Sequence, residues 1–465
     1  MVRQSSPQVV RTRIAPSPTG EDIHIGNLYT ALINFAVARK NKGQFIIRIE
    51  DTDRTRFVPG AEEKILQSIK AFGLDYDEGP DKEGPYTPYR QSERLEMYKK
   101  SASELVAKGH AYYCFCSKER LDMVRAEQQS KKQLPRYDKY CLHEVKNTEE
   151  RIQRGEKYVI RLNVFPDQQV KFVDVIRGEI VFDSNQIDDQ VLLKSDGYPT
   201  YHLGVVVDDH AMNITHIIRA EEWITSTPKH VLLYQAFGWE LPIFAHVPIL
   251  RNPDRSKLSK RKNPVWASWY LEQGFLPEAI LNFLALMGWS HPEEKEIFSL
   301  DEFISLFDLK DVKPAGPIFD IQKLEWMNGV YIRNHQISNL KSQIIQQDPR
   351  LEKLDDDLFD QLLPLAQTRM KKLNEFYELT KYIFEKPQRE LSEKEKEITE
   401  KLKNKLLTIE QWSNETILIT LKQVMEEEGV KMSVLYKVLT GSEHGLPLSD
   451  VLAILGKERV LTLLS

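Results

Sequence analysis

The first fifty residues restrict the fold more than any other part of the chain, because they alternate between strand-like and helix-like patterns. Arg11–Ala15 predicts a short strand, and a turn rich in proline and glycine follows it. Apolar residues then recur at helical spacing over Asn27–Lys40, and Phe45–Ile49 predicts a second strand. A strand, a helix and a strand in this order form a βαβ unit, which requires a parallel sheet. The sequence therefore predicts an α/β domain.

Further along the chain this pattern is interrupted and then resumes. Between Tyr112 and Leu193 the sequence has short β-like runs with charged turns, which indicates an inserted domain. The α/β pattern returns with predicted strands at Tyr201–Val207 and Ile214–Ile218 and a predicted helix at Thr227–Phe237. Beyond Phe298 almost every periodic segment is helical and rich in lysine and glutamate. We therefore expect a split α/β domain followed by a helical region.

Charge and hydropathy exclude several classes of protein. The chain has 465 residues and a net charge of −5, so it is not a strongly basic protein that coats nucleic acid, and any polyanionic partner must meet local basic patches. No apolar stretch reaches the ~18 residues of a membrane-spanning helix, and the N-terminal residues lack the apolar core of a signal peptide. Three cysteines are too few, and odd in number, for a disulfide framework. We expect a cytoplasmic protein with no membrane partner.

Two short motifs indicate a nucleotide site. His24, Gly26 and Asn27 belong to the sequence HIGN, between the first predicted strand and its helix. A helix N-terminus presents unpaired N–H groups to phosphate, Gly26 allows close approach to the backbone, and a histidine can donate to phosphate oxygens. Lys257–Arg261 reads KLSKR on a loop rich in Pro, Asp and Asn, where two ammonium groups could meet a polyphosphate. Each motif alone is weak, because a single histidine is more often structural and a basic loop is more often only solvated.

Together, HIGN and KLSKR resemble the HIGH and KMSKS motifs of the class I aminoacyl-tRNA synthetases. Other segments are similar to the bacterial-type glutamyl-tRNA synthetases within that class. They are spread over residues 1–330, with one more in the helical remainder: TRIAPSPTG (Thr12–Gly20), RIEDTD (Arg48–Asp53), DEGP (Asp77–Pro80), PYRQSER (Pro88–Arg94), DGYPTYHL (Asp196–Leu203), VVDDH (Val206–His210), IRAEEW (Ile218–Trp223), GFLPEAILNFLALMGWS (Gly274–Ser290) and VLTGSEHGLPLSDVLAILGKER (Val438–Arg459). The chain departs from the family pattern at two points: three residues instead of two separate Gly20 from His24, and Asn27 replaces the last histidine of the motif.

The resemblance implies a fold and a function. It implies a Rossmann-type parallel-sheet catalytic domain at residues 11–95 and 196–250, an inserted acceptor-arm-binding α/β domain with a zinc site at 96–195, a connecting domain with the KLSKR loop at 251–330, and an all-helical anticodon-binding region at 331–465. The implied activity is a ligase that joins L-glutamate to tRNA(Glu) through a glutamyl-adenylate, using ATP with Mg²⁺. We expect this enzyme to be a monomer.

The resemblance also assigns site residues. Catalysis rests on positioning and on charge stabilisation at the α-phosphate. The residues that the resemblance assigns to this role are His24, Gly26, Lys257 and Lys260. Asn27 and Ser259 complete the implied ATP-binding set. The glutamate-binding set is Arg13, Ser17, Glu50, Tyr201 and Arg219. In that set Glu50 meets the ammonium and Arg219 meets the side-chain carboxylate, so glutamine should bind poorly because it would leave a desolvated arginine unpaired.

All three cysteines fall in one neighbourhood. Cys114 and Cys116 form C-x-C, and Cys141 forms C-x-H with His143. In an extended segment residues i and i+2 face the same side, so each pair could offer two ligands to one tetrahedral ion. The alternative is a set of buried reduced thiols with an incidental histidine. The spacing resembles that of the zinc-binding glutamyl-tRNA synthetases, which implies one structural Zn²⁺ with no open position.

The choice of tRNA rests on one segment of the helical region, Leu362–Phe384, which is similar to the anticodon-facing helices of the family. Members restricted to tRNA(Glu) tend to place an arginine at the third anticodon base. An ungapped placement puts Gln367 there, with Arg369 two residues further on. Glutamine can both donate and accept, so Gln367 predicts that tRNA(Gln) is also charged, whereas Arg369 in the pocket would reverse the conclusion.

Three other functions are compatible with parts of this sequence but not with the whole of it. A glutamyl-queuosine tRNA modification enzyme shares the catalytic half but lacks the helical region at residues 331–465. A non-catalytic tRNA-binding paralogue would be expected to have lost His24, Gly26 or the lysines of KLSKR, and this chain has them all. A small nucleotidyltransferase would need neither the insertion nor the helical region.

Overall fold

The computed structural model describes residues 9–258, 264–385, 387 and 389–464, and these form two compact units. The first unit consists of Met1–Trp269 and Leu281–Asp320, and the second of Tyr270–Ile280 and Ile321–Ser465. None of the described helices is both long and apolar enough to cross a membrane.

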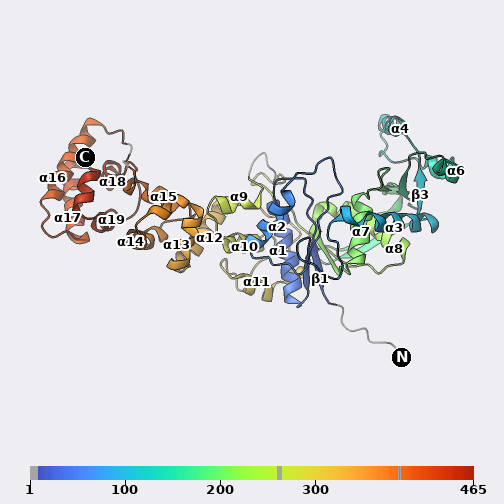
Figure 1. Cartoon of the computed structure of the whole chain (residues 1–465), viewed down its shortest axis with the longest axis horizontal. Coiled ribbons are helices and arrows are strands. Elements are labelled where there is room, and N and C mark those ends of the chain that lie inside the picture. Colours follow the sequence, from blue (N-terminus) through green and yellow to red (C-terminus); the bar gives the residue numbers. More distant parts are fainter. Residues whose placement is uncertain (1–8, 259–263, 386, 388, 465) are drawn as a thin grey trace, which may run out of the picture. The chain divides into compact units, whose positions relative to one another are not determined.

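The first unit contains an α/β domain built on parallel strands (Figure 1). Its strands are β1 (Arg11–Ile14), β2 (Gln44–Ile47), β5 (Gln169–Asp174), β6 (Gly178–Asp183), β8 (His216–Ala220) and β9 (Ile243–Val247). Its helices are α1 (Ile25–Lys40), α2 (Ala61–Ala71), α3 (Leu95–Ala107), α7 (Tyr201–Ala211), α8 (Thr227–Phe237) and α11 (Leu300–Leu306). The 3₁₀ turns of this domain are η1 (Gln91–Arg94), η3 (Glu221–Ser226) and η4 (Leu309–Asp311).

The sheet topology confirms the predicted parallel arrangement. β1 pairs with β2 in parallel, and a four-stranded sheet has the order β6-β5-β9-β8, in which β9 is parallel to both β5 and β8. Backbone and side-chain hydrogen bonds between Arg11 and Thr215 hold β1 beside the start of β8. The carboxyl ends of β1 and β8 therefore lie near each other, together with the N-terminus of α1, which is where ligands bind in open α/β sheets.

One predicted strand is wrong. The segment Tyr201–Val207 is not a strand but the first part of helix α7. A short apolar run does not distinguish a buried strand from a buried helix, and this run packs against α3 and α8 with nearly all its residues buried. The helix that was predicted at Thr227–Phe237 is present as α8, and the strand predicted at Ile214–Ile218 is present as β8.

The sequence between α3 and α7 contributes to two different sheets. A three-stranded antiparallel sheet has the order β3-β4-β7, formed by β3 (Ala111–Cys114), β4 (Val159–Leu162) and β7 (Val191–Leu193). Around it lie α4 (Lys118–Ser130), α5 (Tyr140–His143), α6 (Thr148–Gln153) and the 3₁₀ turn η2 (Ser184–Gln186). The β5–β6 hairpin, although it lies within the predicted insertion, joins the parallel sheet through β9.

The second unit is helical, as predicted. Two helices, α9 (Ala267–Glu272) and α10 (Pro277–Ala285), lie where the chain passes between the units. The others are α12 (Ile321–Asn334), α13 (Ile337–Gln347), α14 (Asp356–Gln367), α15 (Glu375–Thr380), α16 (Glu393–Leu407), α17 (Asn414–Glu428), α18 (Met432–Thr440), α19 (Leu448–Leu455) and α20 (Lys457–Leu463), with 3₁₀ turns η5 (Pro349–Lys353) and η6 (Lys381–Ile383). Ser392 and Ser413 begin α16 and α17 with capping boxes, which fix the first residues of both helices.

Candidate active site and cysteine cluster

The HIGN motif forms the N-terminus of α1. His24 is the N-cap, and its Nδ1 accepts a hydrogen bond from the Gly26 N–H at 3.0 Å. Because Nδ1 is the acceptor, the neutral ring carries its proton on Nε2, which is then a donor. A Cβ on residue 26 would stand only 3.2 Å from that Nδ1, so glycine keeps this cap compact. His24 thus combines a helix cap with a donor at the positive end of the helix.

The segment that follows KLSKR is joined to the same loop. The Ile25 N–H donates to the Val265 carbonyl at 2.7 Å, and the Ala267 N–H donates to the Ile23 carbonyl at 2.9 Å. Asp22, in the stretch that carries the extra residue, is buried and accepts from the Ser268 N–H at 2.9 Å. These segments are therefore neighbours in space, and the described residues of KLSKR, Lys257 and Leu258, line the same cavity as His24 and Gly26.

A cavity of about 240 Å³ lies against these segments. Of the residues predicted for ATP, it brings together His24, Gly26, Asn27 and Lys257, while Ser259 and Lys260 lie outside the described residues. The Lys257 ammonium forms an ion pair with Glu222, a cavity-lining residue that the sequence analysis did not single out. The N-terminus of α1 offers unpaired N–H groups to phosphate on one side of the cavity.

A second cavity of about 110 Å³ shares part of its lining with the first, including Asn27 and Glu222. Four of the five residues predicted for glutamate line it: Arg13, Glu50, Tyr201 and Arg219. Ser17 is not part of the lining; its hydroxyl donates to the Glu50 carbonyl at 2.8 Å and so ties together the loops after β1 and β2. The ring centroids of Tyr201 and Trp223 lie 4.4 Å apart, and both rings line this second cavity.

Arg219 is a buried cation held by neutral groups. It is 6% exposed, and its Nη1 donates to the Tyr201 hydroxyl at 3.0 Å and lies 3.3 Å from His230 Nδ1. Its Nη2 donates to the Thr227 hydroxyl at 2.9 Å, and its Nε donates to His246 Nε2 at 3.2 Å. No carboxylate of the described residues forms an ion pair with it. A buried guanidinium of this kind favours an anionic ligand.

Arg13 and Glu50 belong to a network of buried charges. Arg13 donates from Nε and Nη2 to the two oxygens of Asp209, each at 3.0 Å. Arg48 bridges Asp209 and Glu50, at 2.7 Å and 3.1 Å. Burial raises the pKa of Glu50 even though Arg48 opposes the shift.

The sequence analysis missed two of these partners as site residues, Arg48 and Asp209. Their signal was present, since both occur in segments quoted for the resemblance, RIEDTD and VVDDH. Asp209 is fully buried, and although burial opposes the shift, Arg13 and Arg48 hold its pKa below the ordinary value. Its carboxylate therefore stays ionised and fixes both arginines beside the cavity.

The three cysteines form a compact cluster. Their Sγ atoms lie within 4.8 Å of one another, and those of Cys116 and Cys141 are 3.5 Å apart. The hydroxyl of Tyr137 lies 3.4 Å from the Cys114 sulfur and 3.3 Å from the Cys116 sulfur, a neighbour that the sequence analysis did not foresee. His143 is on the same short helix as Cys141 but is exposed and not part of the group. The thiols fit a soft tetrahedral ion such as zinc.

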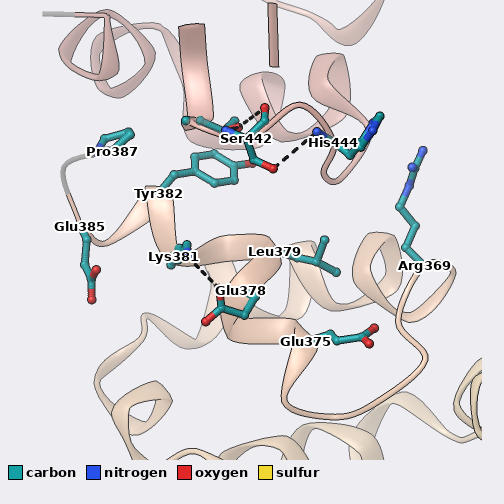
Figure 2. Close-up of a pocket in the computed structure, with 12 residues that line it drawn as sticks. Arg369, Glu375, Glu378, Leu379, Lys381, Tyr382, Glu385, Pro387, Ser442 and His444 are labelled. Carbon is teal, nitrogen blue, oxygen red and sulfur yellow. Dashed lines mark hydrogen bonds and ion pairs between the residues drawn. The ribbon is translucent and has the colours of Figure 1, made fainter. Parts of the chain in front are cut away.

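The helical unit has its own cavity, of about 690 Å³ (Figure 2). Arg369 lies at one side of it, and Ser442 and His444 face the α15 side chains across it. Gln367 does not line the cavity. It is buried, and its amide nitrogen donates to the carbonyls of Ile332 and His335 at 2.9 Å and 2.8 Å, at the end of α12.

Comparison with known proteins agrees with both units. The model of the family described as "tRNA synthetases class I (E and Q), catalytic domain" matches residues 9–326, and that described as "Anticodon binding domain" matches residues 335–464. The chain is 47% identical to the glutamate–tRNA ligase of Thermus thermophilus, over 97% of this chain and 98% of the relative. It is 46% identical to the glutamate–tRNA ligase of Cellvibrio japonicus, over 97% and 91%. A crystal structure of a glutamate–tRNA ligase from Elizabethkingia meningosepticum, in complex with its amino acid, is similar with a TM-score of 0.86 and 33% identity, over 98% of each chain.

Proposed function

This chain belongs to the bacterial-type glutamate–tRNA ligases of the class I aminoacyl-tRNA synthetases, and from that premise we propose which of its residues carry the reaction. The enzyme is a ligase that uses ATP to join glutamate to tRNA(Glu). In the first step a glutamate α-carboxylate oxygen attacks the α-phosphorus and pyrophosphate leaves. In the second step a ribose hydroxyl of the terminal adenosine attacks the acyl carbon of the adenylate, and AMP leaves.

Residues of the cavity beside the α1 N-terminus stabilise the negative charge that develops at the α-phosphate. His24 donates from Nε2, the helix N-terminus adds its N–H groups, and Lys257 and Lys260 supply ammonium groups. Gly26 and Asn27 shape the wall, and Ser259 belongs to the same ATP-binding set. Bound Mg²⁺ would neutralise charge on the phosphates, and the protein residues orient the nucleotide for in-line attack.

The second cavity binds glutamate. Arg219 receives the side-chain carboxylate, Glu50 receives the ammonium, and Arg13, Ser17 and Tyr201 fix the walls around them. The observation that carries this assignment is the buried guanidinium of Arg219, whose described partners are all neutral. Glutamine has no charge to offer it, so selection for glutamate follows from electrostatics.

The substitution Arg219→Gln tests the assignment. Loss of a buried charged hydrogen bond of about 3 kcal/mol should raise the KM for glutamate roughly a hundredfold and weaken discrimination against glutamine, with the KM for ATP unchanged. The control is Arg39→Gln, which removes a partly exposed arginine paired with Asp77, away from both cavities. An Arg219→Gln enzyme with unaltered glutamate kinetics would overturn the assignment.

We also propose that Cys114, Cys116 and Cys141 hold one structural Zn²⁺ in an inserted domain at residues 96–195. The proposed fourth ligand is His143, whose side chain would have to turn toward the sulfurs. Tyr137 already has its hydroxyl beside two of them and is the competing candidate. The ion would fix the fold of this region, so no step of the reaction passes through it.

The remaining parts of the proposal concern architecture and tRNA. The parallel strands β1, β2, β8 and β9 support a Rossmann-type catalytic domain at 11–95 and 196–250, whose sheet the β5–β6 hairpin of the insertion extends, with a connecting domain at 251–330 and an anticodon-binding region at 331–465. The sequence placement of Gln367 is what favours charging of tRNA(Gln) as well as tRNA(Glu), and Arg369, which lines the cavity of the helical unit, is the residue that favours the opposite outcome. A monomeric enzyme in the cytoplasm stays a prediction from the sequence.

A further inference from the structure

Behind Arg219, on the side away from the cavity lining, lies a buried pair formed by Asp174 and His246. The Asp174 carboxylate accepts from His246 Nδ1 at 2.7 Å and from the His246 backbone N–H at 2.9 Å. The opposite ring nitrogen, Nε2, accepts from Arg219 Nε at 3.2 Å. Asp174 is 1% exposed and His246 0%, so the arrangement is closed to solvent.

The sheet places these three residues on three neighbouring strands. Asp174 is the last residue of β5, His246 is on β9 and Arg219 is on β8. Arg219 and His246 are direct partners in the parallel β8–β9 ladder, while Asp174 is paired with Phe244. The β5–β6 hairpin is thus linked to Arg219 through the end of β5 and the His246 ring.

The hydrogen bonds fix the proton of His246. With Asp174 accepting at Nδ1, that nitrogen carries the hydrogen, and Nε2 is free to accept from an N–H donor. The ring is neutral, since burial lowers the pKa of His246 although Asp174 acts in the opposite direction. A carboxylate in the same place would neutralise Arg219, and a cation would repel it. A neutral acceptor orients the guanidinium and leaves its charge available to a ligand.

We propose that Asp174 and His246 are positioning residues that set the side-chain specificity of the enzyme, by holding Arg219 in the orientation that binds the glutamate γ-carboxylate. This inference rests on the proposed role of Arg219. His230 supports the same orientation from another side, because its Nδ1 lies 3.3 Å from Arg219 Nη1 and its Nε2 lies 3.1 Å from His202 Nδ1. All the described groups that hydrogen-bond to the Arg219 guanidinium are therefore uncharged.

Two substitutions remove the orienting acceptor in different ways. Asp174→Asn allows the His246 proton to move to Nε2, which would then face the Arg219 N–H, and His246→Leu removes the acceptor entirely. Each should raise the KM for glutamate by about tenfold or more and lower the preference for glutamate over glutamine, with the KM for ATP within twofold of wild type. His246→Gln can place an amide oxygen near the Nε2 position and should recover most of the selectivity.

The matched control is His291→Leu, which removes another buried histidine paired with a carboxylate, that of Glu302, away from both cavities. It should leave the KM for glutamate unchanged, and melting temperatures of all variants separate misfolding from misorientation. If Arg219→Gln impairs glutamate binding but folded Asp174→Asn and His246→Leu keep wild-type selectivity, the positioning role is refuted and the proposed function stands. If Arg219→Gln itself has no effect, the proposed glutamate site fails.

Discussion

At the scale of single residues, the two cavities contain some side chains that were predicted from the sequence and others that were not. His24, Glu50 and Arg219 were predicted, because they stand in motifs that resemble those of a known family. His246 and Tyr137 were not, because their importance comes from which atoms they touch: a guanidinium in one case and two sulfurs in the other. Contacts between residues far apart in the chain carry no local sequence signal.

The buried histidines make stability depend on pH. Burial, with Lys229 and Arg219 nearby, lowers the pKa of His202 to about 3. Because the folded pKa is below the unfolded value, the unfolded state takes up the proton first, so stability is complete above about pH 6.5 and falls as pH drops toward 3. His202 alone should cost about 2 kcal/mol at pH 5 relative to pH 7. Hydrogen exchange of α7 and α8 amides at the two pH values measures this loss, and His202→Gln should reduce it; an equal loss in both proteins would contradict the prediction.

At the scale of elements, periodicity did not separate helix from strand reliably in segments that are largely buried. The helix α8 was predicted at its observed residues, whereas the apolar run of α7 was mistaken for a strand. The region Asp356–Phe384, which has helical spacing throughout, is divided into α14, α15 and η6, with bounds that the spacing alone does not reveal. The β5–β6 hairpin shows the same limit, because pairing with β9 depends on tertiary contacts.

The prediction for the cysteine cluster can be checked by measuring the metal content of the protein. Purified protein should contain one zinc per chain, and Cys141→Ser should lose it and reduce charging of tRNA(Glu), because the ion fixes β3 and α5 together. Elemental analysis and aminoacylation measure both effects. Tyr137→Phe and His143→Ala then identify the fourth ligand by which of them lowers the zinc content. A wild-type enzyme that is free of zinc and fully active would contradict the proposal.

At the scale of the whole molecule, the chain pairs a catalytic unit with a helical unit that matches an anticodon-binding domain. The resemblance was sufficient to predict this division, because the motifs of the first unit and the family-like segment Val438–Arg459 occur in the expected order. The placement of Gln367 at the third anticodon base stays a prediction, and in the structure its amide nitrogen donates to carbonyls at the end of α12.

Side-by-side charging of purified tRNA(Glu) and tRNA(Gln) tests the prediction that the enzyme accepts both tRNAs. An enzyme without an arginine at the third anticodon base should charge both with efficiencies within about tenfold. Arg369→Gln serves as the comparison, because it removes the arginine that lines the cavity of the helical unit. A preference of about a thousandfold for tRNA(Glu), equivalent to roughly 4 kcal/mol, would contradict the prediction.

The central claim is that a buried arginine in a neutral shell selects glutamate by its side-chain charge. A crystal structure of this enzyme with glutamate bound tests it most directly. We predict a γ-carboxylate oxygen at about 2.8 Å from a terminal nitrogen of Arg219 and the ammonium against the Glu50 carboxylate. Glutamate bound in the reverse orientation, or with its γ-carboxylate away from Arg219, would contradict the account.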